Sequence, residues 1–134
     1  MTYFLDTNIC IYYLNNSNSA VVKQLNKTPV SNIKIPSMVA AELLYGAEKS
    51  AKREKNLKVF ITFLSLFEIV SFDAQAADHY ALIRAELERK GKIIGSNDIV
   101  IAAAVLSSNG VLVTHNTEEF SRFKKLKTAD WTVS

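Results

Sequence analysis

Residues 3–9 read YFLDTNI, a short apolar run that ends on a carboxylate, Asp6, with Thr7 and Asn8 directly after it. An ionised carboxylate at the end of a buried strand is unfavourable unless a cation or hydrogen-bond donors compensate its charge. The stretch therefore predicts a first strand whose last residue faces a functional site. The compensating group is either a basic partner or a metal ion.

The composition favours a single domain, residues 1–134, with a net charge of +3 and one cysteine. Cys10 cannot form an intramolecular disulfide, and the first ten residues lack the pattern of a secretory signal, so we expect a cytoplasmic protein. The longest apolar run, residues 99–106, is far shorter than the ~20 residues that span a bilayer, so we expect no membrane anchor. The positive charge is compatible with a polyanionic partner but does not identify one.

Short apolar runs alternate with helical patterns along the chain. We predict strands at residues 3–5, 33–35, 69–72 and 111–114, with a weaker one at 131–133. We predict helices at residues 9–14, 20–25, 38–67, 74–90 and 97–108. Such alternation indicates an α/β fold, a three-layer α/β/α sandwich around a central parallel sheet of about five strands.

Acidic residues fall close to the ends of the predicted strands. Asp6 ends the first strand, and Glu42 is the polar residue of an apolar stretch, VAAELLYG, in the helix after the second strand. Ser96 and Asn97 are predicted to cap a buried helix that carries Asp98 in its first turn. Because ligands of parallel sheets bind outside the carboxyl ends of the strands, we expect these acids to meet at that edge.

The fourth strand, GVLVTHN, adds Thr114 and Asn116 to this edge, and Glu118 and Glu119 follow. Strand alternation predicts that His115 points away from the face that its two neighbours share. Two carboxylates ~4 Å apart repel by roughly 4 kcal/mol at an effective dielectric constant of ~20, so the cluster needs cations. Oxygen ligands suit Mg²⁺ or Mn²⁺. The sequence thus predicts a metal-dependent hydrolytic nuclease site.

Four segments together resemble the PIN-domain ribonucleases, and more narrowly the VapC toxins of bacterial toxin–antitoxin modules. The segments are LDTNI at Asp6, AAELLYG at Glu42, IGSNDIVIAAA at Asp98, and VTHNTEEF, which holds Asn116 and Glu119. They occur in the family's order and spacing, and the terminal LKTADW resembles the family's last strand. The resemblance spans nearly the whole chain and implies a PIN-like fold.

The resemblance also implies roles for particular residues. Asp6, Glu42 and Asp98 match the family's metal-binding, catalytic acids, and Glu119 matches a fourth acid that is usually Asp. The supporting polar positions of the family are matched by Thr7, Thr114 and Asn116. Glu118 stands beside the longer Glu119, which leaves open which of the two faces the metal and whether one or two ions bind.

Activity and partners follow from the same resemblance. It implies toxic, Mg²⁺- or Mn²⁺-dependent endonucleolytic cleavage of RNA, often of a tRNA. It implies a cognate VapB-type antitoxin, whose tail crosses a groove of the toxin and whose other domain binds operator DNA. It also implies a homodimer and larger assemblies with the antitoxin. The apolar segment VFITFLSLF, residues 59–67, suits burial in the core or against such a partner.

Basic residues lie near the Asp98 motif in the sequence. We predict phosphate contacts from Arg84, Lys90 and Lys92. The lysine-rich residues 49–58 are either a solvated helical face or a further RNA contact.

Several other polar residues have simpler interpretations. We predict that Asp73 caps the helix that begins at residue 74, that Asp130 is solvated or capping, and that Cys10 is a small core residue.

Three alternatives to the nuclease have distinct sequence signatures. A phosphatase with Asp6 as nucleophile would have a second acid two residues later, where this chain has Asn8. A phospho-acceptor domain would have a lysine after a late strand, where this chain has THN at residues 114–116. The third alternative is a non-catalytic nucleic-acid-binding or partner-binding module with a PIN-like shape. Its signature would be loss of the acids, yet all four acidic positions are filled.

Overall fold

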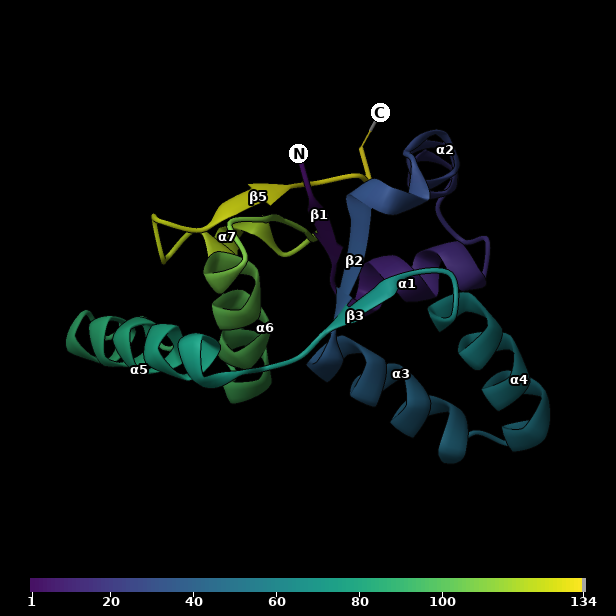
Figure 1. The fold of residues 1–134 in the computed structure, drawn as a ribbon, viewed down its shortest axis with the longest axis horizontal. Coiled ribbons are helices and arrows are strands. Elements are labelled where there is room, and N and C mark those ends of the chain that lie inside the picture. The colour runs from purple at the N-terminus through teal and green to yellow at the C-terminus, as the bar shows by residue number, and fades with distance from the viewer. Residues whose placement is uncertain (134) are drawn as a thin grey trace.

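The computed structural model describes residues 1–133 as a parallel five-stranded sheet with helices around it (Figure 1). The sheet order is β3-β2-β1-β4-β5, and every neighbouring pair is parallel. The strands are β1 (Tyr3–Leu5), β2 (Ile33–Pro36), β3 (Glu68–Val70), β4 (Val111–Val113) and β5 (Lys127–Ala129). The predicted α/β sandwich with five parallel strands is confirmed.

Seven α-helices and one 3₁₀ turn, Val30–Asn32, connect the strands of residues 1–133. The helices are α1 (Thr7–Leu14), α2 (Ser19–Lys27), α3 (Ser37–Glu48), α4 (Arg53–Leu64), α5 (Ala74–Arg89), α6 (Ser96–Ser107) and α7 (Thr117–Phe120). In Figure 1, α1 to α4 gather on one side of the strands and α5 to α7 on the other. None of these helices has the length and apolarity needed to cross a membrane.

The strand order places a topological switch between β1 and β4. From β1 the chain moves through β2 to β3, and then crosses back to β4 and β5 on the other side of β1. The segments that leave β1 and β4 therefore diverge, which opens a crevice at their carboxyl ends. Asp6 sits at this point, because its N–H donates to Val113 O at 3.1 Å as the last bond between the two strands.

The core lies on both faces of the sheet. Phe4, Leu5 and Leu112 of the central strands are fully buried, as is Ile35 of β2. The helix α6 is almost wholly apolar and correspondingly buried, as its sequence predicted. Because α6 is buried at the centre of the molecule, its first turn, which carries Asp98, is held beside the sheet.

A glycine permits a close approach in this core. A Cβ atom on Gly110 would lie 2.3 Å from Cε1 of Phe4, whose ring is fully buried. Only a residue without a side chain fits directly before β4 at this distance.

The structure corrects two predicted elements. The last strand is Lys127–Ala129 and not 131–133, because Trp131 is buried by packing its ring against Tyr3, 5.3 Å between centroids, and not by sheet pairing. The predicted helix 38–67 is two helices, α3 and α4. The turn between them is tied by Ser50, whose hydroxyl donates to Ala47 O at 2.7 Å and accepts from Asn56 Nδ2 at 3.0 Å.

The caps were predicted with mixed success. The carboxylate of Asp73 accepts from the Ala76 N–H at 2.9 Å and caps α5, as predicted. The cap residue of α6 is Gly95, without a side-chain bond, so the prediction that Ser96 and Asn97 cap this helix was wrong. Cys10 is buried in the core, as predicted.

Candidate active site

Asp6 combines a structural role with a chemical one. It is buried and caps α1, since its Oδ1 accepts from the Ile9 N–H at 2.9 Å. Burial raises the pKa of Asp6, and the negative charge of Glu42 raises it further. The hydrogen bonds from Thr114 and from the Ile9 N–H act in the opposite direction and lower the pKa. A carboxylate whose ionised form is disfavoured in this way gains from a bound cation.

Glu42 reaches this carboxylate from α3, where it is partly buried. Thr7 Oγ1 donates a hydrogen bond to Glu42 Oε1 at 2.6 Å, which fixes the glutamate side chain from the first turn of α1. Thr7 therefore orients an acid that lies 35 positions later in the sequence.

Asp98 lies in the first turn of α6 and is half-buried. Burial, followed by the charges of Glu119, Glu42 and Asp6, raises the pKa of Asp98 to about 6. The other three predicted acids therefore lie close enough to Asp98 for their charges to act on it.

The segment after β4 supplies the fourth acid. Thr114 is fully buried, and its Oγ1 accepts from the Asn116 N–H at 3.0 Å. Asn116 Nδ2 in turn donates to Glu119 Oε2, which holds this carboxylate at the start of α7. Glu119 raises the pKa of Asp98, whereas Glu118 is not among the groups that do so.

A small pocket of about 190 Å³ brings together three of the four predicted acids, Asp6, Glu42 and Asp98, whereas Glu119 and Thr114 are not part of its lining. Its lining residues are Asp6, Thr7, Asn8, Glu42, Asp98, Ile101, Asn116 and Phe120. Carboxylate and amide oxygens are the ligands that Mg²⁺ and Mn²⁺ prefer, so the donor set fits a hard divalent cation. In residues 1–133 no three acidic, His or Cys side chains are arranged around one ion position. Such ions bind through one or two carboxylates, with water and phosphate oxygens completing the shell.

A second cavity, of about 490 Å³, opens beside this pocket and shares Asp6, Asn8 and Asn116 with it. His115 and Asp130 also line it, so His115 lies outside the acidic pocket, as predicted, but faces this second cavity together with Asn116. The strand β4 ends at Val113, and strand alternation does not extend to residue 115.

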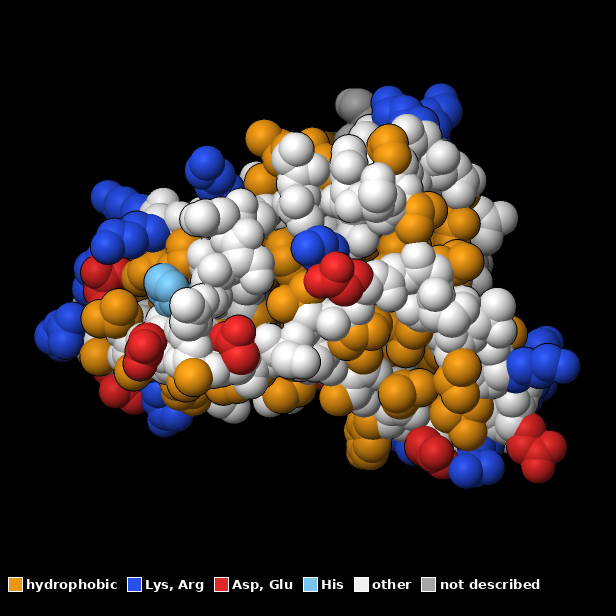
Figure 2. Space-filling model, viewed as in Figure 1, with side chains coloured by type: hydrophobic (Ala, Val, Ile, Leu, Met, Phe, Trp, Pro, Cys, Tyr) orange, Lys and Arg blue, Asp and Glu red, His pale blue; other side chains and the backbone are white. Residues whose placement is uncertain are grey.

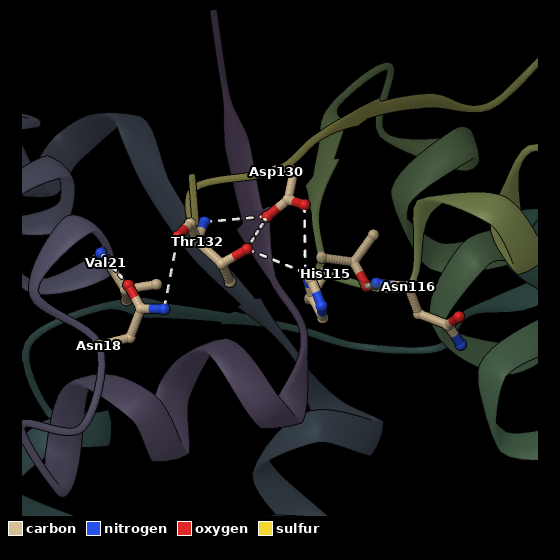
Figure 3. A network of polar contacts seen from close by, with 7 residues as sticks. Asn18, Val21, His115, Asn116, Asp130 and Thr132 are labelled. Atoms are coloured by element: carbon tan, nitrogen blue, oxygen red, sulfur yellow. Dashed lines mark hydrogen bonds and ion pairs between the residues drawn. The ribbon is translucent and has the colours of Figure 1, made fainter. Parts of the chain in front are cut away.

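His115 belongs to a polar network (Figure 3). Its Nδ1 lies 3.2 Å from Asp130 Oδ2 and 2.9 Å from Thr132 Oγ1. Thr132 also donates to Asp130 Oδ1 through its hydroxyl, at 2.6 Å, and its N–H, at 2.9 Å. Asn18, the cap of α2, donates to Thr132 O at 3.4 Å and ties the network to the fold. Sequence reasoning missed this network because His115 is 15 residues from Asp130 and 17 from Thr132 in the chain.

A third cavity, of about 710 Å³, is basic. Lys90, Lys92, Arg122 and Lys124 line it, together with Glu118, which also lines the second cavity. Arg122 Nη1 donates to Ile93 O at 3.1 Å, which anchors the guanidinium at the rim. Sequence reasoning missed Arg122 and Lys124 because only the fold brings the loop after α7 next to the loop after α5.

Arg84, the other predicted phosphate contact, is not part of that cavity lining. It pairs with Glu88 at 3.3 Å and donates to Tyr80 Oη at 2.9 Å on the surface of α5.

The helix α4 buries only part of its apolar surface. Phe63 and Leu64 are in the core, but Val59 and Ile61 are exposed, as is Leu66 just after the helix. Figure 2 shows apolar side chains gathered on the face over α3 and α4.

Comparisons with known proteins agree with this fold. The model of the PIN-domain family matches residues 3–126. The chain is 43% identical to "Ribonuclease VapC2" of Rickettsia felis over 132 residues, 98% of each chain. It is 41% identical to the "tRNA(fMet)-specific endonuclease VapC" of Shigella flexneri over 131 residues, again 98% of each chain.

Solved structures show the same similarity. The structure of DNA-bound VapBC from Salmonella typhimurium superposes with a TM-score of 0.91 at 40% identity, covering 98% of both chains. VapBC2 from Rickettsia felis, bound to a DNA fragment of its promoter, gives a TM-score of 0.89 at 42% identity, covering 98% of this chain and 99% of that one. The chain therefore belongs to the PIN-domain family and, within it, to the VapC ribonucleases.

Proposed function

We propose that this ribonuclease is the toxin of a toxin–antitoxin pair and cleaves tRNA internally with Mg²⁺ or Mn²⁺ at the acidic pocket. The observation that carries the proposal is the shared site of Asp6, Glu42, Asp98 and Glu119, in which three of the acids raise the pKa of the fourth. Four acids on one rim of the sheet are costly without a cation, and a phosphodiester is the substrate that an ion in such a place serves.

Three of the four acids have a distinct hydrogen-bond partner in the protein. Asp6 is fixed by its capping bond to Ile9, Glu42 by Thr7, and Glu119 by Asn116. The carboxylates would hold one or two ions, because their oxygens are oriented before any ligand arrives. Glu119, and not Glu118, is the fourth acid in this proposal.

A bound ion would supply a water of lowered pKa and stabilise negative charge on the phosphoryl oxygens. Hydrolysis adds the water oxygen to phosphorus and releases one ester oxygen as an alcohol. The buried apolar neighbours Ile101 and Phe120 line the same pocket and limit the access of bulk water.

The basic cavity is the best place for the RNA backbone beyond the cut. Lys90, Lys92, Arg122 and Lys124 carry four positive charges, and the shared Glu118 marks where this cavity meets the one beside the acids. Phosphate contacts of this kind hold and orient RNA without reading its sequence. Arg84, already paired with Glu88, is the weaker candidate for such a contact.

A tRNA substrate is supported by the relatives from Shigella flexneri and Salmonella typhimurium, which are named tRNA(fMet)-specific endonucleases. An antitoxin partner is supported by the VapBC complexes among the similar structures, two of them bound to DNA. We place the protein in the cytoplasm, where tRNA is available, and expect a homodimer that joins its antitoxin in a larger assembly. Operator DNA would be contacted through the antitoxin.

The test is cleavage of purified tRNA by the antitoxin-free chain in Mn²⁺ and in EDTA. Asp6→Asn is the matched variant, because the amide oxygen retains the capping bond to Ile9 while the charge is removed. Metal-dependent cleavage that this variant loses is the expected result. A folded native chain that cuts no RNA would favour the alternative, a non-catalytic binding module.

A further inference from the structure

The cavity beside the acidic pocket has a chemistry that differs from both of its neighbours. It is lined by Asp6, Glu118 and Asp130 and by no Lys or Arg. A phosphate would be repelled there, whereas the basic cavity on the far side of Glu118 attracts one. Hydrogen-bond acceptors of this kind suit the exocyclic amino groups of nucleic-acid bases.

Two rings stand in this lining, Tyr12 and His115. Tyr12 follows Asn8 by four residues on α1, so both lie on one face of the helix. Unpaired RNA bases commonly stack on aromatic side chains and form hydrogen bonds along their edges. The cavity therefore offers flat surfaces for stacking as well as polar groups.

The polar network fixes the proton on His115. The hydroxyl proton of Thr132 goes to Asp130 Oδ1, so Thr132 Oγ1 can only accept from His115 Nδ1. Asp130 Oδ2, which also faces Nδ1, is a carboxylate oxygen and accepts as well. Nδ1 thus carries a proton, and Nε2 is left for a contact at the other edge of the ring.

The hydrogen bonds of the network also hold the His115 ring in one orientation. The side chain of His115 is 62% exposed, while Asp130 behind it is only 22% exposed. Trp131, between the two network residues Asp130 and Thr132, is buried against Tyr3. An exposed ring that is hydrogen-bonded to partly buried side chains is oriented before a ligand binds, which lowers the entropic cost of binding.

We infer that this cavity binds the RNA base next to the scissile phosphate, and that His115 contacts this base and helps to select it. The inference rests on the proposed function, because a phosphodiester at Asp6 brings its neighbouring nucleotide to the cavity that shares Asp6, Asn8 and Asn116 with the pocket. The preferred base carries an exocyclic amino group, since the carboxylate oxygens of the lining accept hydrogen bonds.

The experiment compares two enzymes on three RNAs. The native chain and His115→Ala are each tested on an oligonucleotide that contains the mapped cut site, and on the same RNA made abasic in turn at each nucleotide beside that site. Loss of the contacted base is expected to reduce kcat/KM by on the order of tenfold for the native chain. His115→Ala is expected to lose a similar factor on intact RNA and little more on the abasic RNA.

Two controls separate this contact from other effects. His79→Ala removes the other histidine, which lies on α5 and lines a different cavity. This variant should cleave all of the RNAs as the native chain does. The rise in Tm on adding Mn²⁺ should be the same in His115→Ala as in the native chain, because the acids are intact.

The outcomes are distinguishable. An equal loss on intact and on both abasic RNAs would overturn the base contact while the nuclease stands, and would leave the acidic cavity to a basic side chain of a protein partner. Absence of any cleavage by the native chain would overturn the proposed function, and the base contact with it.

Discussion

Thr7 Oγ1 donates a 2.6 Å hydrogen bond to Glu42 Oε1, so the residue after the first acid of the site orients the second. The bond joins α1 to α3 across the carboxyl edge of the sheet. Partners of this kind fix the direction in which a carboxylate presents its oxygens.

Replacing this hydroxyl should weaken metal binding without loss of the fold. Thr7→Val keeps the shape of the side chain and removes the donor, so we expect cleavage to fall by about 10–100-fold. Thr7→Ser retains the donor and should stay near native activity. Equal activity of Val and Ser at this position, measured as kcat/KM at limiting Mn²⁺, would contradict an orienting role.

The raised pKa of Asp98, about 6, makes the stability of the metal-free protein depend on pH. The folded state binds this proton more tightly than the unfolded state, so the contribution of Asp98 is present at pH ~4 and is lost as the pH rises through ~6. Asp98→Asn should therefore be stabilising at pH 7.5 relative to its effect at pH 4, by about 1 kcal/mol for a half-exposed group. Urea unfolding of both proteins at the two pH values measures this difference.

Divalent ions should stabilise the native chain more than Asp98→Asn. At pH 7.5, Mn²⁺ at 10–100 times its Kd should raise the Tm of the native chain by about 5 °C and that of Asp98→Asn by much less. Below pH 6 the proton competes with the ion and the rise should shrink. A thermal shift that is equal in the two proteins would show that Asp98 is not a ligand.

Loss of the basic cavity should affect RNA binding more than chemistry. Lys92→Ala and Lys124→Ala should each raise KM for tRNA severalfold, leave kcat near native, and reduce the slope of log K against log salt by about one. Lys27→Ala, on α2, removes the same charge away from this cavity and is the matched control. Should Lys27→Ala weaken binding as much, the effect would come from net charge and not from a site.

The contact of Gly110 with Phe4 predicts a pair of opposite stability changes. Gly110→Ala places a methyl group 2.3 Å from the buried ring and should cost about 1–3 kcal/mol of unfolding free energy. Gly46→Ala, inside α3, meets nothing within 4 Å and should stabilise the protein by up to about 1 kcal/mol. Thermal unfolding of the two variants compares them directly, and a similar sign in both would refute the packing argument.

The central strands were predictable because buried strands appear in the sequence as short apolar runs. The strands β1, β2 and β4 were predicted to within one residue, since each is enclosed on both faces. The edge strand β5, Lys127–Ala129, has few apolar residues. The strand was predicted at 131–133 instead, because Trp131 is a large apolar residue. The break between α3 and α4 contains neither Gly nor Pro, so the sequence has no helix-breaking residue that would have predicted it.

The candidate site was predictable in part for similar reasons. Asp6, Glu42 and Asp98 stood out as acids within apolar stretches, and the structure brings all three into one pocket. The network of His115, Asp130 and Thr132 depends on a loop that crosses the end of the sheet, and no periodic pattern encodes such a crossing. Interactions between distant loops are the part of a site that only the fold reveals.

The most direct test of the central claim is incubation of purified, antitoxin-free protein with total cellular RNA in Mg²⁺ or Mn²⁺, followed by mapping of new 5′ ends. EDTA and Asp98→Asn are the controls. Discrete cuts that need the ion and vanish in both controls are the predicted result. Cuts that persist in EDTA or in folded Asp98→Asn, or no cuts by the folded native chain, would contradict a metal-dependent nuclease at this site.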